Sequence, residues 1–444
     1  MLRCCVLYTI AAFSTCATVQ AVVPLPAVAT SGSSTLQLSA AFAIRPSVGS
    51  THPVLNAAAS RVEAALFAHG GRSVPIGVTA PPGVALNALI VNVTHSFAPP
   101  RLGSDESYSL RITADQPAAT LTAATINGAL HGLQTFAQLC HFDFDTDAVT
   151  ISGVPWSIDD KPRFAHRGLL LDTSRHFYAP AALIPLLDAM SAVKMNVFHW
   201  HLSDSTSFPL VVPGTNLSAG AYGRSQRYSR ADVETVVKAA TERAIRIIPE
   251  FDLPSHTAPA WCVGEPDICT GSATAVNPAS ARLYEVIEAV VAAVAGGKDA
   301  LFPDEFIHLG GDEVTLSDWT ADATVAAYLR KQHPGMSLDN AAEAEAYGTF
   351  MAKLDAIAAK YGRKVVHWED VFDWAGPMKS CGGVTPILSN ETIVQVFRGG
   401  FGPGPKPCED QMKGGCVCGS NGAATTKAVV QAGYQAIWDP PGAW

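Results

Sequence analysis

Phe306-Ile307-His308-Leu309-Gly310-Gly311-Asp312-Glu313-Val314 passes from an apolar strand pattern directly into two adjacent acids. Gly310 and Gly311 allow the backbone to turn tightly where the strand ends. Side chains of neighbouring residues that leave a strand diverge, so Asp312 and Glu313 can contact different atoms of one ligand. Such a pair suits acid-assisted cleavage of a sugar acetal. Two acids also fit the first turn of a helix, where they complement the macrodipole and satisfy free amides.

Strand-like and helix-like patterns alternate on both sides of this stretch. Further apolar strands are expected at residues 166–172, 196–202, 245–252, 364–369, 392–397 and 434–438. Helical spacing is expected at residues 180–194, 283–295, 323–331 and 341–361, and in a helix that Ser229 caps. Repeated strand–helix units predict an α/β fold with a parallel sheet, most simply a (β/α) TIM-type barrel.

Charged or indole side chains occur at the ends of five successive predicted strands. They are Arg167 and Asp172 on either side of the first strand, His201 and Asp204 after the second, Glu250, Asp252 and His256 after the third, Asp312 and Glu313 after the fourth, and Trp368, Glu369 and Asp370 after the fifth. Active sites of such barrels lie at the carboxyl ends of the strands. Each residue alone could be a structural polar group. Charged or indole side chains at the ends of five successive strands are harder to explain by packing, because packing favours Val, Ile and Leu.

The chain of 444 residues exceeds the size at which one core usually stops growing, so two domains are expected. Residues 22–155 predict a small α+β domain, with strands at 36–42, 88–94 and 107–113 and helices at 56–67 and 125–140. The pattern changes near Pro155. Residues 156–444 then form the predicted catalytic barrel.

Residues 1–21 resemble a secretory signal peptide, with Arg3, an apolar run and small side chains up to Ala21. No later run of about 18 apolar residues predicts a membrane span. We therefore expect a soluble protein of the secretory pathway, in the lysosome, a vacuole or the extracellular space. Export would make Asn92, Asn216 and Asn390 available for glycosylation, because each begins an Asn-x-Ser/Thr triplet.

Composition and cysteine spacing narrow the class further. Hydrophobic residues at 48% and charged residues at 16% indicate a folded, core-rich protein, and the net charge of −9 argues against a nucleic-acid partner. Removal of the signal leaves seven of the ten cysteines. Cys262 and Cys269 could close a small loop. Cys408, Cys416 and Cys418 lack the fourth ligand of a structural zinc site, which favours disulfides over metal binding.

Several longer sequence motifs follow one another along the chain. They are Arg163-Phe164-Ala165-His166-Arg167-Gly168, Asp172-Thr173-Ser174-Arg175-His176, Asn196-Val197-Phe198-His199-Trp200-His201, Pro249-Glu250-Phe251-Asp252 and the His308 to Val314 part of the opening stretch. With them, the chain from about Glu106 onward resembles the β-N-acetylhexosaminidases of glycoside hydrolase family 20, lysosomal subunits included. Residues 128–136 also resemble a helix of the small domain that precedes the barrel in this family.

The resemblance implies hydrolysis of terminal β-linked N-acetylhexosamine from glycans, in which the acetamido oxygen of the substrate attacks the anomeric carbon. Glu313 would protonate the leaving oxygen and later activate water. Asp312 would accept a hydrogen bond from the acetamido N–H. The family implies neither a metal nor another cofactor, and it makes a homodimer plausible.

The resemblance also implies binding roles for five other residues. Arg167 would hold the hydroxyls at C3 and C4, and Asp204 would pair with Arg167 or accept a sugar hydroxyl. His256 would contact Glu313 or an adjoining acid. Trp368 and Phe397 would form walls around the acetamido methyl group, with Phe397 in a place where many relatives carry a tryptophan.

The carboxyl terminus departs from the family pattern. Relatives continue beyond the seventh strand with a tyrosine, an asparagine or aspartate, and an eighth strand that bears a tryptophan and a glutamate. We therefore expect a barrel that lacks its last strand, encoded by a truncated gene product, and we expect residues 22–444 alone to be a poor catalyst.

Two alternative functions remain. His199 and His201 share one face of a strand and, with Asp204 and His256, could bind zinc in a metal-dependent barrel hydrolase. A catalytically impaired sugar-binding or chaperone-like protein would instead explain the missing strand. Replacement of Glu313 by Gln separates an enzyme, which would lose turnover, from a lectin, which would not change.

Overall fold

The computed structural model describes residues 22–72, 85–95, 97–315, 317–332, 334, 340–375, 388–389, 391–397 and 422–439. The predicted signal peptide, Asn390 and the cysteines at 408, 416 and 418 lie outside these residues. The chain forms two compact units. The first contains the described residues up to Ala98 together with Asp105–Arg163, and the second contains Pro99–Ser104 and the residues from Phe164 onward.

The first unit is a mixed sheet covered by two helices. The described strands, in spatial order, are β1 (Val28–Thr30), β8 (Trp156–Asp160), β4 (Tyr108–Ile112), β5 (Ala118–Ala123), β3 (Leu86–Val93), β2 (Ser34–Pro46), β7 (Ala148–Val154) and β6 (Cys140–Asp143). The β2–β3 and β3–β5 pairs are parallel and the other pairs are antiparallel. Helices α1 (Pro53–Leu66) and α2 (Ile126–Leu139) pack against each other and against the sheet.

Helix α2 approaches the sheet very closely. Thr125 caps its first turn by accepting a hydrogen bond from the Gly128 amide at 3.1 Å. A Cβ atom at Gly128 would lie 2.3 Å from the Ser107 carbonyl oxygen, and one at Gly132 would lie 2.3 Å from Leu121. These glycines therefore allow a contact between helix and sheet that larger residues would prevent.

The second unit is built on a parallel sheet whose strands follow chain order. They are β9 (Gly168–Asp172), β10 (Val197–Ser203), β11 (Arg246–Phe251), β12 (Phe306–His308), β13 (Lys364–Trp368), β14 (Ile393–Val396) and β15 (Gln435–Trp438). Each strand pairs in parallel with the next. Among the described residues, no pairing joins β9 to β15. This curved sheet with its helices has the architecture predicted for a (β/α) TIM-type barrel.

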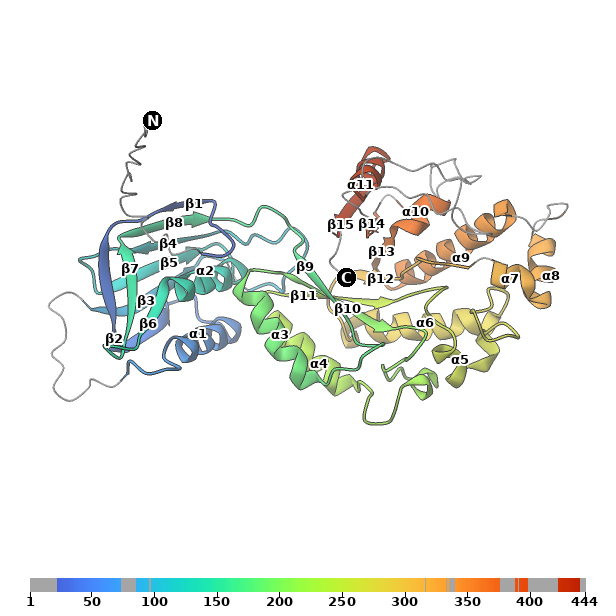
Figure 1. Ribbon diagram of the computed structural model, residues 1–444, viewed down its shortest axis with the longest axis horizontal. Helices are drawn as coiled ribbons and strands as arrows, with labels where there is room; N and C mark the ends of the chain where they lie inside the picture. The colour runs from blue at the N-terminus through green and yellow to red at the C-terminus, as the bar shows by residue number, and fades with distance from the viewer. Residues whose placement is uncertain are drawn as a thin grey trace, which may run out of the picture. The chain divides into compact units, whose positions relative to one another are not determined.

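Helices follow the strands of this sheet (Figure 1). The longer ones are α3 (Pro180–Ala192), α4 (Arg230–Thr241), α6 (Ala281–Ala295), α8 (Ala323–Gln332), α9 (Asn340–Lys360) and α11 (Gly422–Gln431). Shorter segments are α5 (Ala260–Gly264), α7 (Ser317–Ala321), α10 (Glu369–Ala375), η1 (Leu217–Gly220), η2 (Pro266–Ile268) and η3 (Gly297–Asp299). Ser229 and Asp232 form a reciprocal capping box at α4, as the sequence predicts for the Ser229 cap. None of the described helices is both long and apolar enough to span a bilayer.

Side chains on one face of this sheet form two layers, one apolar and one mostly polar. The layer near the amino ends is an apolar cluster of Val197, Ile248, Phe306, Val366 and Ile393. Two residues further along the same strands are His199, Glu250, His308, Trp368 and Gln395, all buried. Since side chains two residues apart in a strand share a face, the same face changes from apolar to polar toward the carboxyl ends.

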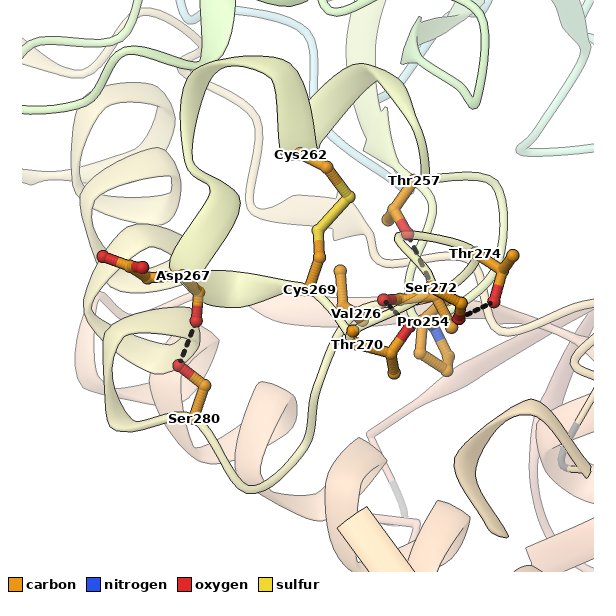
Figure 2. The surroundings of a disulfide bond; sticks show 12 residues. Pro254, Thr257, Cys262, Asp267, Cys269, Thr270, Ser272, Thr274, Val276 and Ser280 are labelled. Carbon is orange, nitrogen blue, oxygen red and sulfur yellow. Dashed lines mark hydrogen bonds between the residues drawn. A yellow bond between two sulfur atoms is a disulfide. The ribbon is translucent and has the colours of Figure 1, made fainter. Parts of the chain in front are cut away.

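The loop after β11 is closed by a disulfide between Cys262 in α5 and Cys269 after η2 (Figure 2). Their Cα atoms are 5.9 Å apart, within the ordinary range for a disulfide. Ser280 donates a hydrogen bond to the Asp267 carbonyl oxygen beside it. The small loop predicted from these two cysteines is therefore confirmed.

The structure moves the domain boundary that the sequence placed near Pro155. Strand β8 begins at Trp156 but pairs with β1 and β4 of the first sheet. The division between the units falls between Arg163 and Phe164 instead. A pairing with strands about 50 residues earlier, as of Ile158 with Leu110, gives no local signal in the sequence.

Candidate active site

A cavity of about 270 Å³ lies at the carboxyl ends of the strands in the second unit. It is lined by Leu170, Asp172, Arg175, His201, Asp252, His256, Asp312, Glu313, Trp368 and Phe397. This volume is close to the lower end of ordinary ligand pockets, about 300 Å³, so the cavity suits one small ligand. Of the seven predicted site residues, Asp312, Glu313, His256, Trp368 and Phe397 line it.

Asp312 and Glu313 leave the end of β12 toward different surroundings. The Asp312 side chain is 14% exposed, whereas that of Glu313 is 63% exposed. Glu313 has a positive φ of 53°, and its amide donates to Asp370 Oδ1 at 3.2 Å. The nearest following helix, α7, begins only at Ser317. The interpretation of the two acids as a helix start is therefore wrong.

The turn before these acids requires glycine. Gly310 and Gly311 have φ values of 64° and 112°, in the region that disfavours side chains. A Cβ atom at Gly310 would lie 1.8 Å from Asp252 Oδ1. The same Asp252 oxygen accepts a hydrogen bond from the Gly311 amide at 3.0 Å. The Asp252 carboxyl thus occupies the space that a side chain at position 310 would need. Its hydrogen bond from the Gly311 amide fixes the backbone next to Asp312.

Asp252 and Asp312 form a carboxyl pair in the wall of the cavity. Burial and the adjacent Asp312 hold the pKa of Asp252 well above its ordinary range. Burial also raises the pKa of Asp312, while the hydrogen bond with Asp252 opposes that rise. Asp252 is therefore the protonated partner, and it donates to Asp312.

His256 connects three acids at the rim of the cavity. Its Nδ1 lies 3.2 Å from Asp204 Oδ2, and its Nε2 lies 3.4 Å from Glu313 Oε2 and 3.6 Å from Asp312 Oδ2. Burial would lower the pKa of His256, but hydrogen bonds with Asp204 and Glu313 raise it to about 10. The imidazolium therefore supplies a positive charge between the acids.

Asp204 is buried beneath the rim, with 2% of its side chain exposed, so it is not a solvated loop acid. Its Oδ2 contacts Arg175 at 2.7 Å and His201 Nε2 at 3.1 Å, besides His256. Burial would raise the pKa of Asp204, but hydrogen bonds from His201 and His256 hold it well below its usual range. Asp204 is thus a fixed anion that orients its neighbours.

Arg167, predicted to hold the substrate hydroxyls, lies at the opposite end of β9, and that prediction is corrected. It precedes the strand, and its guanidinium donates to the carbonyl oxygens of Lys194 at 2.7 Å and Phe164 at 2.6 Å. Arg175, which follows the strand, lines the cavity instead. Its two terminal nitrogens contact Asp172 at 2.8 Å and Asp204 at 2.7 Å.

Trp368 and Phe397 form an aromatic corner of the cavity. Their ring centroids are 5.3 Å apart, and the planes cross at 72°. The Trp368 indole N–H donates to Glu250 Oε1 at 2.8 Å. Trp368 is therefore held by a charged partner as well as by packing.

Glu250 is a fully buried carboxylate surrounded by ring nitrogens. Oε2 lies 2.7 Å from His201 Nδ1 and 2.8 Å from His199 Nε2, and Oε1 lies 3.4 Å from His308 Nδ1. Burial would raise the pKa of Glu250, but the nearby imidazoles hold it well below its ordinary range. Burial would lower the pKa of His201, which Glu250 and Asp204 raise to about 10.

Three groups of described residues have the ligand types and spacing of a metal site. They are His199, Glu250 and His308; Asp172, His201 and Asp204; and Asp252, His256 and Asp312. In the second group, Arg175 already forms ion pairs with both Asp172 and Asp204. In the third, protonated Asp252 donates a hydrogen bond to Asp312. The protein's own cations and protons therefore already contact the acids of these two groups. Among the described residues, the set His199, His201, Asp204 and His256 does not form one ligand group.

Comparison with protein families gives two matches. Residues 164–404 match glycosyl hydrolase family 20, catalytic domain, and residues 22–139 match the family described as beta-acetyl hexosaminidase like. The chain belongs to glycosyl hydrolase family 20. The first match covers the strands whose ends line the cavity from β9 to β14, so the family resemblance seen in the sequence is confirmed.

Individual family 20 relatives agree with this assignment. Beta-hexosaminidase 3 of Arabidopsis thaliana is 38% identical over 65% of this chain and 52% of its own length. Beta-hexosaminidase subunit beta of Homo sapiens is 35% identical over 70% of this chain and 54% of its own length. The solved chitobiase of Flavobacterium johnsoniae has a TM-score of 0.75 and 27% identity, over 94% of this chain and 58% of that one. The chain thus spans about half the length of the curated relatives it matches.

Proposed function

We propose that this protein removes terminal, non-reducing β-linked N-acetylhexosamine from glycans with retention of configuration. The observation that carries the proposal is the pair of adjacent acids at one cavity, each in a different environment. Glu313 is mostly exposed and can protonate a leaving oxygen. Asp312 is largely buried and can accept the acetamido N–H. The two acids would thus serve different atoms of one sugar.

The surrounding residues support this division of roles. Asp252 donates to Asp312, which fixes the carboxylate that would orient the acetamido group. The acetamido oxygen would then attack the anomeric carbon, and Asp312 would stabilise the charge that develops. As the bond to the leaving oxygen breaks, Glu313 would give that oxygen its proton. Glu313 would later take a proton from water, which opens the ring formed with the acetamido group.

Binding of the sugar would involve groups on opposite sides of the cavity. Arg175, held by Asp172 and Asp204, offers donors for ring hydroxyls. Trp368 and Phe397 offer an apolar corner for the acetamido methyl. Asp204 would act through Arg175 and His256, and His256 would act on the proton of Glu313.

The experiment is hydrolysis of 4-nitrophenyl N-acetyl-β-D-glucosaminide by the chain and by its Glu313→Gln variant. The variant is expected to lose about 10²–10⁴-fold in kcat while it still binds N-acetylglucosamine. Glu285→Gln, an exposed acid on α6, is the matched control and should keep the parent rate. A Glu313→Gln variant with the parent rate would contradict the assignment. Loss of activity on chelation would instead support the metal-dependent alternative.

We also propose that the protein enters the secretory pathway and resides in the lysosome, a vacuole or outside the cell. The composition of residues 1–21 and the Cys262–Cys269 disulfide support an oxidising compartment. Asn216 is exposed and available for a glycan. Expression in a secreting host should give a product whose mass falls on removal of N-glycans. Light scattering of that product tests the further proposal of a homodimer.

A further inference from the structure

In the polar layer below the cavity, the carboxylate of Glu250 contacts side chains from two walls of the site. Glu250 is fully buried, and its two oxygens have different partners. Oε1 accepts from the Trp368 indole at 2.8 Å. Oε2 lies 2.7 Å from His201 Nδ1. Trp368 and His201 both line the cavity, whereas Glu250 is not among the residues that line it.

The contact through His201 continues to the residues beside the proton donor. His201 Nε2 lies 3.1 Å from Asp204, whose same oxygen contacts Arg175 at 2.7 Å and His256 at 3.2 Å. His256 in turn lies 3.4 Å from Glu313. A continuous series of short polar contacts therefore runs from the aromatic corner, under the cavity, to the proposed acid.

We propose that Glu250 is a positioning residue that couples the acetamido corner of the site to its proton donor. Its carboxylate fixes the ring of Trp368 on one side and the His201–Asp204 pair on the other. The inference rests on the proposed function and adds a residue that does not itself contact the sugar. A low pKa for Glu250 agrees with it, since the residue remains an anion in this setting.

Beside a protonated His201, the geometry favours a carboxylate at this position. Trp368 Nε1 can only donate, and His201 donates through Nδ1 while its Nε2 faces the Asp204 anion. A glutamine of the same size has one accepting oxygen and one donating amide nitrogen. Beside a protonated His201, that nitrogen would face the N–H of either Trp368 or His201. Glu250→Gln therefore either breaks one of the two contacts or makes His201 give up its Nδ1 proton, and with it the positive charge that faces Asp204.

Asp304→Asn is the matched control for this substitution. Asp304 is an equally buried acid in the same unit, paired with Arg246 at 3.0 Å at the amino ends of the strands. Both variants exchange a buried carboxylate for an amide and both are expected to lower stability. Only Glu250→Gln is expected to alter the site.

The test measures the dissociation constant of N-acetylglucosamine by calorimetry, with kcat and KM for the nitrophenyl substrate. We expect Glu250→Gln to weaken binding about tenfold or more, to raise KM and to lower kcat, because contacts with a charged group are lost. Asp304→Asn should show parent values per folded molecule. Equal constants for the parent, Glu250→Gln and Asp304→Asn would overturn the inference.

A double-mutant cycle with Trp368→Phe separates positioning from general destabilisation. Phenylalanine keeps an aromatic ring but has no N–H to offer Glu250. The loss caused by Glu250→Gln should therefore be smaller in the Trp368→Phe background than in the parent. Strictly additive losses would contradict the coupling. If Glu250→Gln does not fold, Trp368→Phe alone decides, since unchanged binding would show that the indole contact has no role.

Failure of the inference can be distinguished from failure of the proposed function. A parent chain that neither binds N-acetylglucosamine nor releases nitrophenol contradicts both. A parent chain that binds, with a Glu250→Gln variant that binds equally well, contradicts only the positioning role.

Discussion

The two ends of the same barrel use similar residues for different purposes. At the amino end, Arg246 and Asp304 are both buried and pair only 3.0 Å apart. Arg167 there donates to backbone carbonyls. At the carboxyl end, Arg175 is part of the cavity lining and joins two acids that also face other partners. The position of an arginine along its strand therefore decides whether it supports the fold or can contact a ligand.

The acids differ between the ends in the same way. Asp304 accepts hydrogen bonds from the Arg246 guanidinium and from the Phe306 amide, both within the fold. Asp312 instead accepts a hydrogen bond from protonated Asp252 and lies near His256, while part of its side chain still reaches the cavity. Ionisable groups whose pKa values are shifted by burial and by neighbouring charges are typical of catalytic sites. The comparison predicts that substitutions at the carboxyl end change ligand binding and pH dependence, whereas those at the amino end change stability alone.

The largest expected effect is on the pH dependence of stability. The pKa of His201 is raised to about 10, above its ordinary value of about 6.5. Its stabilising contribution is therefore complete below about pH 6.5 and is lost as the pH rises through about 10. The difference in unfolding free energy between the parent and Glu250→Gln should be several kcal/mol near pH 6 and should shrink toward pH 10. Urea unfolding at a series of pH values measures it, and a constant difference would contradict the ion pair.

Replacement of Arg175 or Arg167 by alanine gives the second largest expected effects. Arg175→Ala should weaken N-acetylglucosamine binding by about 1.5–3 kcal/mol, or roughly 10–150-fold, because donors from a charged group are lost. Arg167→Ala should leave affinity unchanged and lower the unfolding free energy, since it removes bonds to Lys194 and Phe164 carbonyls. Calorimetry and thermal unfolding measure the two quantities. The opposite pattern would restore Arg167 as the binding residue.

The disulfide should contribute about 2.5 kcal/mol, the chain-entropy value for so short a loop. Cys262 and Cys269 are seven positions apart and close the segment that follows His256. Replacement of both by alanine is expected to lower the unfolding free energy by about that amount. Chemical unfolding with and without the substitutions measures it. An unchanged free energy would show that the loop is fixed by its other contacts.

The smallest expected effect is at the aromatic corner. Phe397→Trp would enlarge a ring that already packs edge-on against Trp368. We expect a change in the KM for the nitrophenyl substrate of less than about 1 kcal/mol, or roughly fivefold, because the aromatic wall is retained. A much larger change would show that the size of this residue decides the fit of the sugar.

Much of the barrel could be predicted from the sequence, because the amphipathic helices and apolar strands carry their own periodicity. The helix predicted at 180–194 is observed at Pro180–Ala192, and the strand predicted at 392–397 is observed at Ile393–Val396. Strand β5, Ala118–Ala123, was missed because its alanine and threonine residues give little apolar contrast. The role of β8 was also missed, since it depends on pairing with distant strands.

The candidate site could be predicted in part for a physical reason. Strand ends locate polar groups near a cavity, which identified Asp312, Glu313 and His256. The sequence does not reveal at which end of a strand an arginine lies unless the first and last residues of the strand are known to within a residue or two. The binding role was therefore assigned to Arg167 from the family resemblance and none was assigned to Arg175, although Arg175 follows Asp172 by only three residues. Glu250 and Asp252 were noted as strand-end acids, but their partners depend on contacts between strands.

A crystal structure of the Glu313→Gln chain with N-acetylglucosamine tests the proposed site most directly. We expect one sugar in the cavity at the carboxyl ends, with its acetamido nitrogen within hydrogen-bond distance of Asp312 and its ring hydroxyls near Arg175. A sugar bound elsewhere, or bound in the cavity with its acetamido group directed away from Asp312, would contradict it.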